Sequence, residues 1–263
     1  MTEKWKHAIR HSGASLKGFL ALFFEHPGFA VKLLGARFYY FRNRELKEPV
    51  ITPDGYRIEA PTELLSYWSL RVEKECFRGS WAQSLKRETA PFIVDVGANA
   101  GMFTHLLWSI KPQVEIFAFE PLPRMNQKIR AWGDRTKAKL TLFQHAVSDR
   151  CGTAMFCADA ENDTSASLQL NGDQRKGFQV ETVTLDSVLP NRPIFLIKID
   201  VEGFEPEVLV GAKKAIQNAR FLVIEAHTKA ARDKLVQQLG PGWRSEQVGS
   251  SDYFFRRTED LSL

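Results

Sequence analysis

From residue 92 onward, short runs of apolar and β-branched residues alternate with segments whose apolar positions recur at helical spacing. The runs predict strands and the intervening segments predict helices. Five strands are expected at Phe92–Val96, Val114–Glu120, Lys139–Val147, Pro193–Asp200 and Arg220–His227, with helices at Met102–Ile110, Pro123–Gly133, Glu205–Ala219 and Lys229–Leu239. Strands that alternate with helices indicate a parallel sheet with helices on both faces. The last segments, WRSEQV and YFFRR, predict a hairpin that adds an antiparallel edge strand.

The third and fourth strands are separated by a long stretch, about residues 150–192, without a helical pattern. Two extended pieces, TAMFCA and FQVETVTL, flank the polar segment ENDTSASLQLNGDQRKG. A long polar loop above the strand ends is typical of lids and of substrate-reading loops. A surface insertion without a function fits the same sequence.

The N-terminal residues differ in composition from the rest of the chain. Residues 1–48 contain nine basic and four acidic residues, so the net charge of +5 lies entirely in this segment. Aromatic residues interleave with the cations, and a break at Pro27-Gly28 predicts two short amphipathic helices. Residues 49–60 predict a hairpin that turns at Pro53-Asp54-Gly55, and residues 61–90 predict helix interrupted at Gly79. We therefore expect an arm over residues 1–60 and a main domain over residues 61–263.

The arm has two interpretations. Its aromatic and basic side chains suit peripheral contact of residues 1–48 with an anionic membrane surface, or they pack on the main domain. The body carries no net charge, which argues against nucleic acid as a partner. Three cysteines, Cys76, Cys151 and Cys157, are too few and too irregularly spaced for a disulfide framework or a zinc site. These cysteines indicate a reducing, cytoplasmic compartment. The apolar run Phe19–Phe24 is too short to span a bilayer, so we expect any membrane contact to be peripheral, at the inner face.

The first predicted strand leads into a glycine-bearing loop, Gly97-Ala98-Asn99-Ala100-Gly101, before a helix. Glycines let the backbone approach a ligand, and free N–H groups at a helix start can face its polar atoms. The loop lacks the middle glycine of a dinucleotide site, which disfavours a nicotinamide oxidoreductase, and it lacks the lysine of a P-loop. Asp95 would repel pyrophosphate and attract an ammonium group. The loop therefore suits S-adenosylmethionine, although a tight turn without a ligand remains the alternative.

Polar residues end each of the other predicted strands, and parallel strands present these ends at one edge of the sheet. Glu120 lies where a carboxylate takes ribose hydroxyls, and Ala146 and Asp149 could border an adenine. Asp200 and Glu202 share one face of an extended segment, as do Glu225 and His227. Carboxylates beside an imidazole suit a general base for a hydroxyl nucleophile. They also suit a divalent cation, but the sequence alone fixes no metal site.

The segments FIVDVGANAG, IFAFEPLP, AVSD, VTLDSVL and IKIDVEGFEPEVLVGA resemble the FkbM-type methyltransferases from about Ile93 to the C-terminus. This resemblance implies a Rossmann-like class I methyltransferase fold, with a mostly parallel seven-stranded sheet, an antiparallel edge strand and helices on both faces. It also implies S-adenosyl-L-methionine as methyl donor and a hydroxyl acceptor on a glycan, lipid-linked sugar or secondary metabolite. The residues that the resemblance implies at the cofactor are Asp95, Gly97, Asn99, Gly101, Glu120 and Asp149. Ala146 is a further cofactor candidate from its place at the end of the third strand.

The same resemblance places Asp200 and Glu202 at the reaction centre, and the residue pattern adds His227 as a candidate base. The first 60 or so residues match no part of the family pattern. A membrane-docking or scaffold protein that retains the fold without catalysis is therefore the second hypothesis. The acceptor itself is not encoded in any motif that we identify.

Overall fold

The computed structural model describes residues 20, 22–43, 45–53, 55–68, 80–157, 167–168, 177–248 and 251–259. The chain forms two compact units, residues 1–86 and 87–263. The boundary thus follows Lys86 instead of residue 60, because the helix after the hairpin contacts the N-terminal helix.

The N-terminal unit is built on α3 (Pro27–Asn43), the hairpin of β1 (Val50–Ile51) and β2 (Arg57–Ile58), and α4 (Pro61–Trp68). The predicted hairpin is confirmed, since β1 pairs antiparallel with β2. One face of α3 buries Phe29, Ala30 and Leu33, and the Phe29 ring meets that of Tyr67 edge-on, with centroids 5.7 Å apart. Most of the helix predicted before Pro27 lies outside the described residues, as do residues 69–79 before α5 (Ser80–Arg87).

A neighbouring face of α3 is apolar but exposed. Val31, Leu34, Phe38 and Phe41 follow one another at helical spacing and are 58%, 45%, 53% and 51% exposed. Among the helices that the structure describes, none combines the length and the apolar content needed to cross a bilayer.

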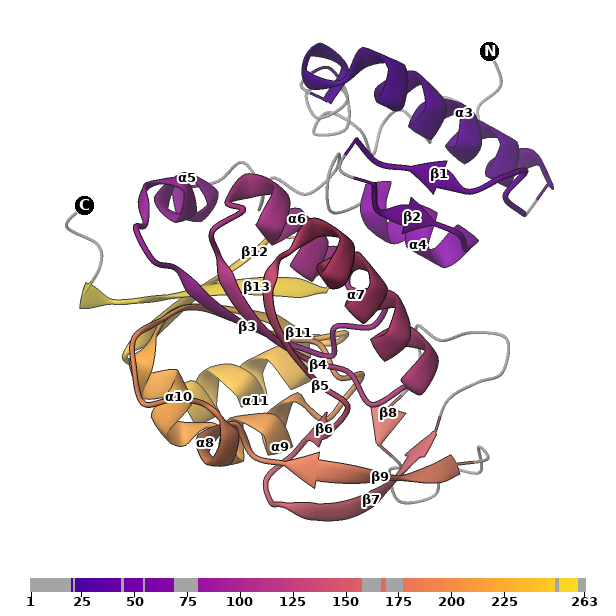
Figure 1. The fold of residues 1–263 in the computed structure, drawn as a ribbon. Coiled ribbons are helices and arrows are strands. Elements are labelled where there is room, and N and C mark those ends of the chain that lie inside the picture. Colours follow the sequence, from indigo (N-terminus) through magenta and orange to yellow (C-terminus); the bar gives the residue numbers. More distant parts are fainter. Residues whose placement is uncertain are drawn as a thin grey trace. The chain divides into compact units, whose positions relative to one another are not determined.

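The second unit is a seven-stranded sheet in the order β12-β13-β11-β10-β3-β4-β5 (Figure 1). Its strands are β3 (Phe92–Val96), β4 (Glu115–Phe119), β5 (Lys139–Phe143), β10 (Ile194–Ile199), β11 (Ala219–Glu225), β12 (Trp243–Gln247) and β13 (Asp252–Arg257). The strands from β5 to β11 are parallel, and β13 runs antiparallel between β11 and β12. The expected α/β class with a mostly parallel seven-stranded sheet is confirmed.

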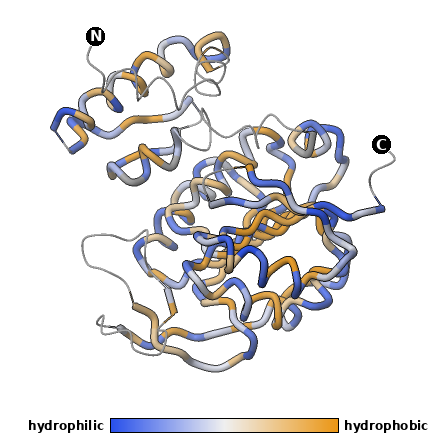
Figure 2. Tube along the Cα trace, turned by 180° about the vertical axis from the view of Figure 1, so that it is seen from behind, coloured by the Kyte–Doolittle hydropathy of each residue, from blue (hydrophilic) through white to orange (hydrophobic). Residues whose placement is uncertain are grey.

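Helices cover both faces of this sheet (Figure 1). On one side lie α6 (Met102–Ile110) and α7 (Pro123–Thr136), and on the other lie α8 (Leu185–Val188), α9 (Glu205–Val210), α10 (Lys213–Asn218) and α11 (Lys229–Leu239). Figure 2 shows hydrophobic residues gathered along the central strands. Because β3 and β10 are buried over their full length, their sequences are almost continuous apolar runs.

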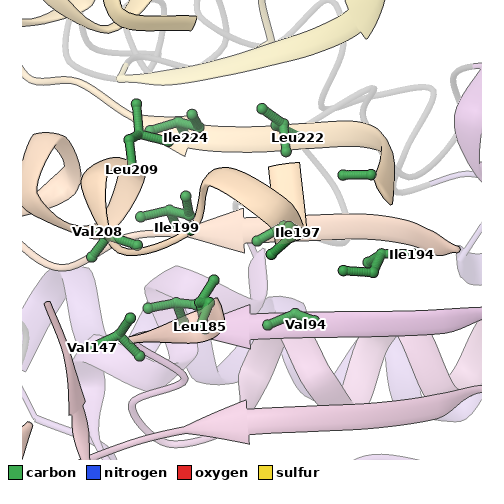
Figure 3. Packing of buried hydrophobic residues seen from close by; sticks show 14 of the residues in the cluster. Val94, Val147, Leu185, Ile194, Ile197, Ile199, Val208, Leu209, Leu222 and Ile224 are labelled. Carbon is green, nitrogen blue, oxygen red and sulfur yellow. The ribbon is translucent and has the colours of Figure 1, made fainter. Parts of the chain in front are cut away.

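Figure 3 shows the core between the sheet and the second helix layer. Val94, Ile197, Ile199, Leu222 and Ile224 belong to one buried cluster with residues of α9, α10 and α11. Side chains at alternate strand positions point to the other face. Asp95 and Lys198 occupy those alternate positions, opposite each other in the register of β3 and β10. The polar network of the site therefore lies on the α6 side of the sheet.

Two sequence predictions need correction. The strand expected at Lys139–Val147 ends at Phe143, because Ala146 and Val147 form β6 and pair with β9 (Gly177–Val183). The helix expected at Glu205–Ala219 is two helices, separated at Gly211. A Cβ at Gly211 would lie 2.2 Å from the backbone oxygen of Ser148. The helix is therefore interrupted at the residue where its backbone contacts the backbone of Ser148.

The predicted insertion forms a second sheet in the order β6-β9-β7-β8. The expected extended pieces are β7 (Gly152–Cys157) and β9, which pair antiparallel. A short strand, β8 (Ser167–Leu168), pairs with β7. Most of the polar segment between β7 and β9 lies outside the described residues.

Candidate active site

The loop between β3 and α6 is fixed between the ends of the neighbouring strands. The amides of Gly97 and Ala98 both donate to the Phe119 oxygen, at 3.1 and 3.0 Å. Gly97 and Gly101 have φ of 74° and 78°, a region that glycine adopts readily. A Cβ at Gly97 would lie 1.8 Å from the backbone oxygen of Asp200. The loop therefore touches β4 on one side and β10 on the other, as expected for a ligand loop at the strand ends.

Glu120 holds this loop from the end of β4. Its carboxylate accepts hydrogen bonds from the amides of Asn99, at 2.8 Å, and Leu122, at 2.7 Å. Asn99 itself has a φ of 50°. Burial raises the pKa of Glu120 to about 7, against the two amide hydrogen bonds that lower it. The predicted ribose-binding carboxylate is thus joined to the predicted cofactor loop, and its charge changes near neutral pH.

Asp95 is fully buried beneath α6. Thr104 of α6 donates to its Oδ2 at 2.7 Å, and the Lys198 ammonium lies 3.6 Å from its Oδ1. Its Oδ1 has no hydrogen-bond donor among the described residues. In this structure Asp95 contacts other parts of the protein, and direct contact with a ligand remains a prediction.

Lys198 joins three parts of the site. Its ammonium donates to the Gly97 oxygen at 3.0 Å and forms an ion pair with Asp200 at 3.0 Å, besides the contact with Asp95. Burial alone would lower the pKa of Lys198, but Asp200 and Asp95 raise it above its usual range. Lys198 was not among the predicted site residues. The signal was present, because a lysine inside an apolar run such as IFLIKI is almost never buried without a partner.

The turn after β10 presents Glu202. Its φ of 55° is uncommon for a residue with a side chain. Glu205 stabilises the turn by accepting hydrogen bonds from the amides of Val201 and Gly203, both at 3.1 Å. Burial and the nearby Asp200 raise the pKa of Glu202 above its usual value.

The end of β11 faces this turn. The Nε2 atom of His227 lies 3.2 Å from an oxygen of Glu202 and 3.2 Å from an oxygen of Glu225. Ser251 donates to the other oxygen of Glu225 at 2.8 Å. Burial, and then the neighbouring Asp200, raise the pKa of Glu225 to about 9. The structure thus brings together the three residues predicted at the reaction centre, and it adds Glu225, which the sequence placed beside His227 without a role.

The two residues predicted at the adenine make different contacts. Ala146 is buried in a cluster with Leu122, Phe156, Leu168 and Val180. Asp149 accepts a hydrogen bond from the Ser148 hydroxyl at 3.1 Å and lines a hollow formed by residues of α9 and α11. Among the described residues, no hydrogen bond or ion pair joins Asp149 to the Gly97–Gly101 loop. Their role at the adenine remains a prediction.

The chain matches one family model and several known proteins in sequence. The model described as the methyltransferase FkbM domain matches residues 95–254. The 2-O-methyltransferase NoeI of Sinorhizobium fredii is 31% identical over 160 residues, which cover 54% of this chain and 65% of NoeI. The chain therefore spans slightly less than two thirds of NoeI.

Two further relatives match over longer segments. The 31-O-demethyl-FK506 methyltransferase FkbM of Streptomyces tacrolimicus is 30% identical over 200 residues, 64% of this chain and 77% of the relative. The hexuronic acid methyltransferase AglP of Haloferax volcanii is 24% identical over 179 residues, 65% of this chain and 70% of the relative. The family match covers more than half of the chain and includes the glycine loop, Glu120, Lys198 and the acidic ends of β10 and β11. This protein belongs to the FkbM methyltransferase family.

Proposed function

We propose that this protein is an S-adenosylmethionine-dependent O-methyltransferase that acts on a hydroxyl of a glycan, a lipid-linked sugar or a secondary metabolite. The observation that carries the proposal is the loop from Gly97 to Gly101, hydrogen-bonded through Asn99 to the buried carboxylate of Glu120. The loop contains no lysine or arginine for a phosphate, and the surrounding carboxylates favour a cationic ligand. These residues fit S-adenosylmethionine, which supplies a methyl group on a positively charged sulfur when bound.

The residues of this chain would act in three ways. The carboxylate of Glu120 retains lone pairs that can accept the ribose hydroxyls. Lys198, through Gly97 and Asp200, keeps the loop aligned with the end of β10. Asp200 or His227 takes the proton of the acceptor hydroxyl. Because the donor carries a good leaving group, alignment of the acceptor oxygen and exclusion of water are the main tasks of the protein.

The acceptor class follows from the relatives and from charge. AglP is named for a hexuronic acid, NoeI for a 2-O position and FkbM for a 31-O position. The net positive charge of this chain lies in residues 1–48, so the unit with the site lacks the basic surface of a nucleic-acid-binding protein. A small-molecule or glycan hydroxyl is the acceptor that agrees with both observations.

The proposal predicts that S-adenosylhomocysteine binds the full-length protein in isothermal titration calorimetry. NADH, the ligand expected of a nicotinamide oxidoreductase, should show no change in fluorescence when it is mixed with the protein. If the wild-type protein gives no binding heat with millimolar S-adenosylhomocysteine, or if NADH binds in its place, the assignment fails.

A second proposal concerns the exposed face of α3. Val31, Leu34, Phe38 and Phe41 form an exposed apolar stripe on a segment rich in lysine and arginine. Such a helix suits the interface of an anionic bilayer, with its apolar side chains at the headgroup level. We propose that α3 holds the protein at a membrane surface, and therefore close to a lipid-linked acceptor.

Vesicle flotation tests this second proposal. The wild-type protein should float with vesicles containing anionic lipid and much less with neutral ones, and the double variant Phe38→Glu/Phe41→Glu should remain in solution. Phe178→Glu/Met155→Glu is a matched control, because Phe178 and Met155 are 41% and 39% exposed in the other unit. Equal flotation of all three proteins, or no flotation of the wild type, would leave the stripe with a packing role.

A further inference from the structure

Three potential metal ligands at the ends of two neighbouring strands, β10 and β11, lie within one small volume. Each of Glu202, Glu225 and His227 offers one ligand atom, and these atoms all lie within 4.8 Å of one another. Nε2 of His227 lies 3.2 Å from each of the two carboxylate oxygens. The imidazole is 54% exposed and the Glu225 side chain 15% exposed, so the group is open to solvent on the histidine side.

Hydrogen bonding within the protein does not satisfy this group. A neutral imidazole nitrogen carries at most one hydrogen, and among the described residues Nε2 makes a hydrogen bond with Glu202 only. The facing oxygen of Glu225 is buried and has no hydrogen-bond donor among the residues that the structure describes. Asp200 adds a further negative charge, which acts on both Glu202 and Glu225. The Lys198 ammonium acts on Glu225, but among the ion pairs of the described residues none joins a lysine or arginine to Glu202 or Glu225. No protein cation among these residues is therefore a partner of all three ligand atoms.

A divalent cation would supply that partner. Two metal–ligand bonds of about 2.1 Å that meet at a right angle place their ligand atoms roughly 3 Å apart. This agrees with the two 3.2 Å separations around Nε2. One imidazole with two carboxylates is a ligand set that suits first-row divalent metals such as Mn²⁺. Three protein ligands leave coordination positions free for water or for an acceptor hydroxyl.

The position of the group in the sheet assigns it to the acceptor side. In strand order, Glu120 follows β4, the Gly97 loop follows β3, Asp200 follows β10 and Glu225 ends β11. Glu202 thus lies one strand from the loop, and Glu225 and His227 lie two strands from it, roughly 5 and 10 Å at the usual strand spacing. We propose that Glu202, Glu225 and His227 bind a divalent metal ion that holds the acceptor hydroxyl beside the donor.

The role of the metal ion depends on the proposed methyl transfer, whereas the test of metal binding does not. A cation at this position would make the acceptor hydroxyl easier to deprotonate. Because His227 would bind the metal through Nε2, the proton would pass to Asp200. The acceptor oxygen would then form its bond to the methyl carbon while the carbon–sulfur bond breaks and leaves S-adenosylhomocysteine.

Electron paramagnetic resonance with Mn²⁺ tests the site directly, because bound Mn²⁺ loses the signal of the free ion. We expect the metal-stripped full-length protein to bind one Mn²⁺, and His227→Ala and Glu225→Gln to bind it more weakly by about tenfold or more. Glu202→Gln should show the same loss and provides a third variant if one of the others does not fold. Circular dichroism reports the fold of each.

His145→Ala is the matched control. His145 forms a 3.0 Å pair with Glu181 on the second sheet, and no third histidine, cysteine or carboxylate of the described residues lies close enough to hold a metal with this pair. This variant should bind Mn²⁺ like the wild type. Absence of Mn²⁺ binding by the wild type at millimolar metal, or equal binding by all variants, would overturn the proposal. Calorimetry with S-adenosylhomocysteine in EDTA separates the metal proposal from the methyl-transfer proposal. If S-adenosylhomocysteine binds but Mn²⁺ does not, the metal site is rejected and the proposed methyl transfer stands.

Discussion

Lys198→Met is expected to lower the free energy of unfolding by about 3–5 kcal/mol, the usual cost of leaving a buried charge without its partner. Asp95 is fully buried and has no other cation among its contacts in the described residues. The substitution would also remove the hydrogen bond to the Gly97 oxygen. Urea denaturation at pH 7, followed by circular dichroism, measures the loss.

Two further variants distinguish a buried charge from a general effect of methionine. Lys213→Met removes an exposed lysine and should change the free energy of unfolding little. Asp95→Asn combined with Lys198→Met should recover part of the stability, because an asparagine oxygen can still accept the Thr104 hydrogen bond. If Lys198→Met unfolds at the same urea concentration as Lys213→Met, the ion network does not stabilise the site.

Glu120→Gln is expected to weaken S-adenosylhomocysteine binding by about tenfold to a hundredfold, because hydrogen bonds to a charged group contribute about 1.5–3 kcal/mol. The carboxylate accepts from two backbone amides on its two oxygens. A glutamine side chain has only one acceptor atom, so one amide would face an NH₂ group and the loop would lose its attachment. Calorimetry measures the affinity, and Glu181→Gln, with a side chain that is 75% exposed, is the control.

The pKa of Glu120, raised by burial to about 7, adds a pH dependence to this result. If the ionised carboxylate accepts the ribose hydroxyls, wild-type affinity should rise about tenfold between pH 6 and pH 8. The free energy of unfolding should change in the opposite direction. A raised carboxyl pKa means that the fold resists ionisation, so stability is lost as the pH rises from the unfolded pKa through the folded pKa. Glu120→Gln should show no such rise in affinity and a smaller loss of stability with pH, because Glu225, whose pKa is raised to about 9, still contributes to that loss. An unchanged pH profile of binding in the wild type would contradict the role of the carboxylate.

The order of elements in the second unit followed from the sequence. Apolar runs ended by polar residues placed β3 with its bounds unchanged, and β4, β10 and β11 with bounds shifted by one or two residues. Period-two alternation placed Glu202 and Glu225 near His227, because side chains on one face of neighbouring parallel strands end at one edge of the sheet. The glycine loop was predictable for a related reason, since a strand that enters a helix through glycines allows close backbone contact.

Other features depended on neighbours far apart in the chain. The partners of Lys198 follow from the register of β3 and β10, and Lys198 and Gly97 are 101 positions apart. Local apolarity continued the third strand to Val147, yet pairing with β9 takes Ala146 and Val147 into another sheet. Because α4 packs against α3, the boundary between the units follows Lys86 and not residue 60.

By itself, the sequence determined which residues lie at the carboxyl edge of the sheet, because spacing along a strand fixes the face and the end of each side chain. The tertiary structure alone decided which of these acids are buried, which share a cation and which face each other. Asp95 is enclosed under α6, whereas His227 remains half exposed. Burial and pairing depend on strand order and on helix packing, and these properties control the charge and the chemistry of the site.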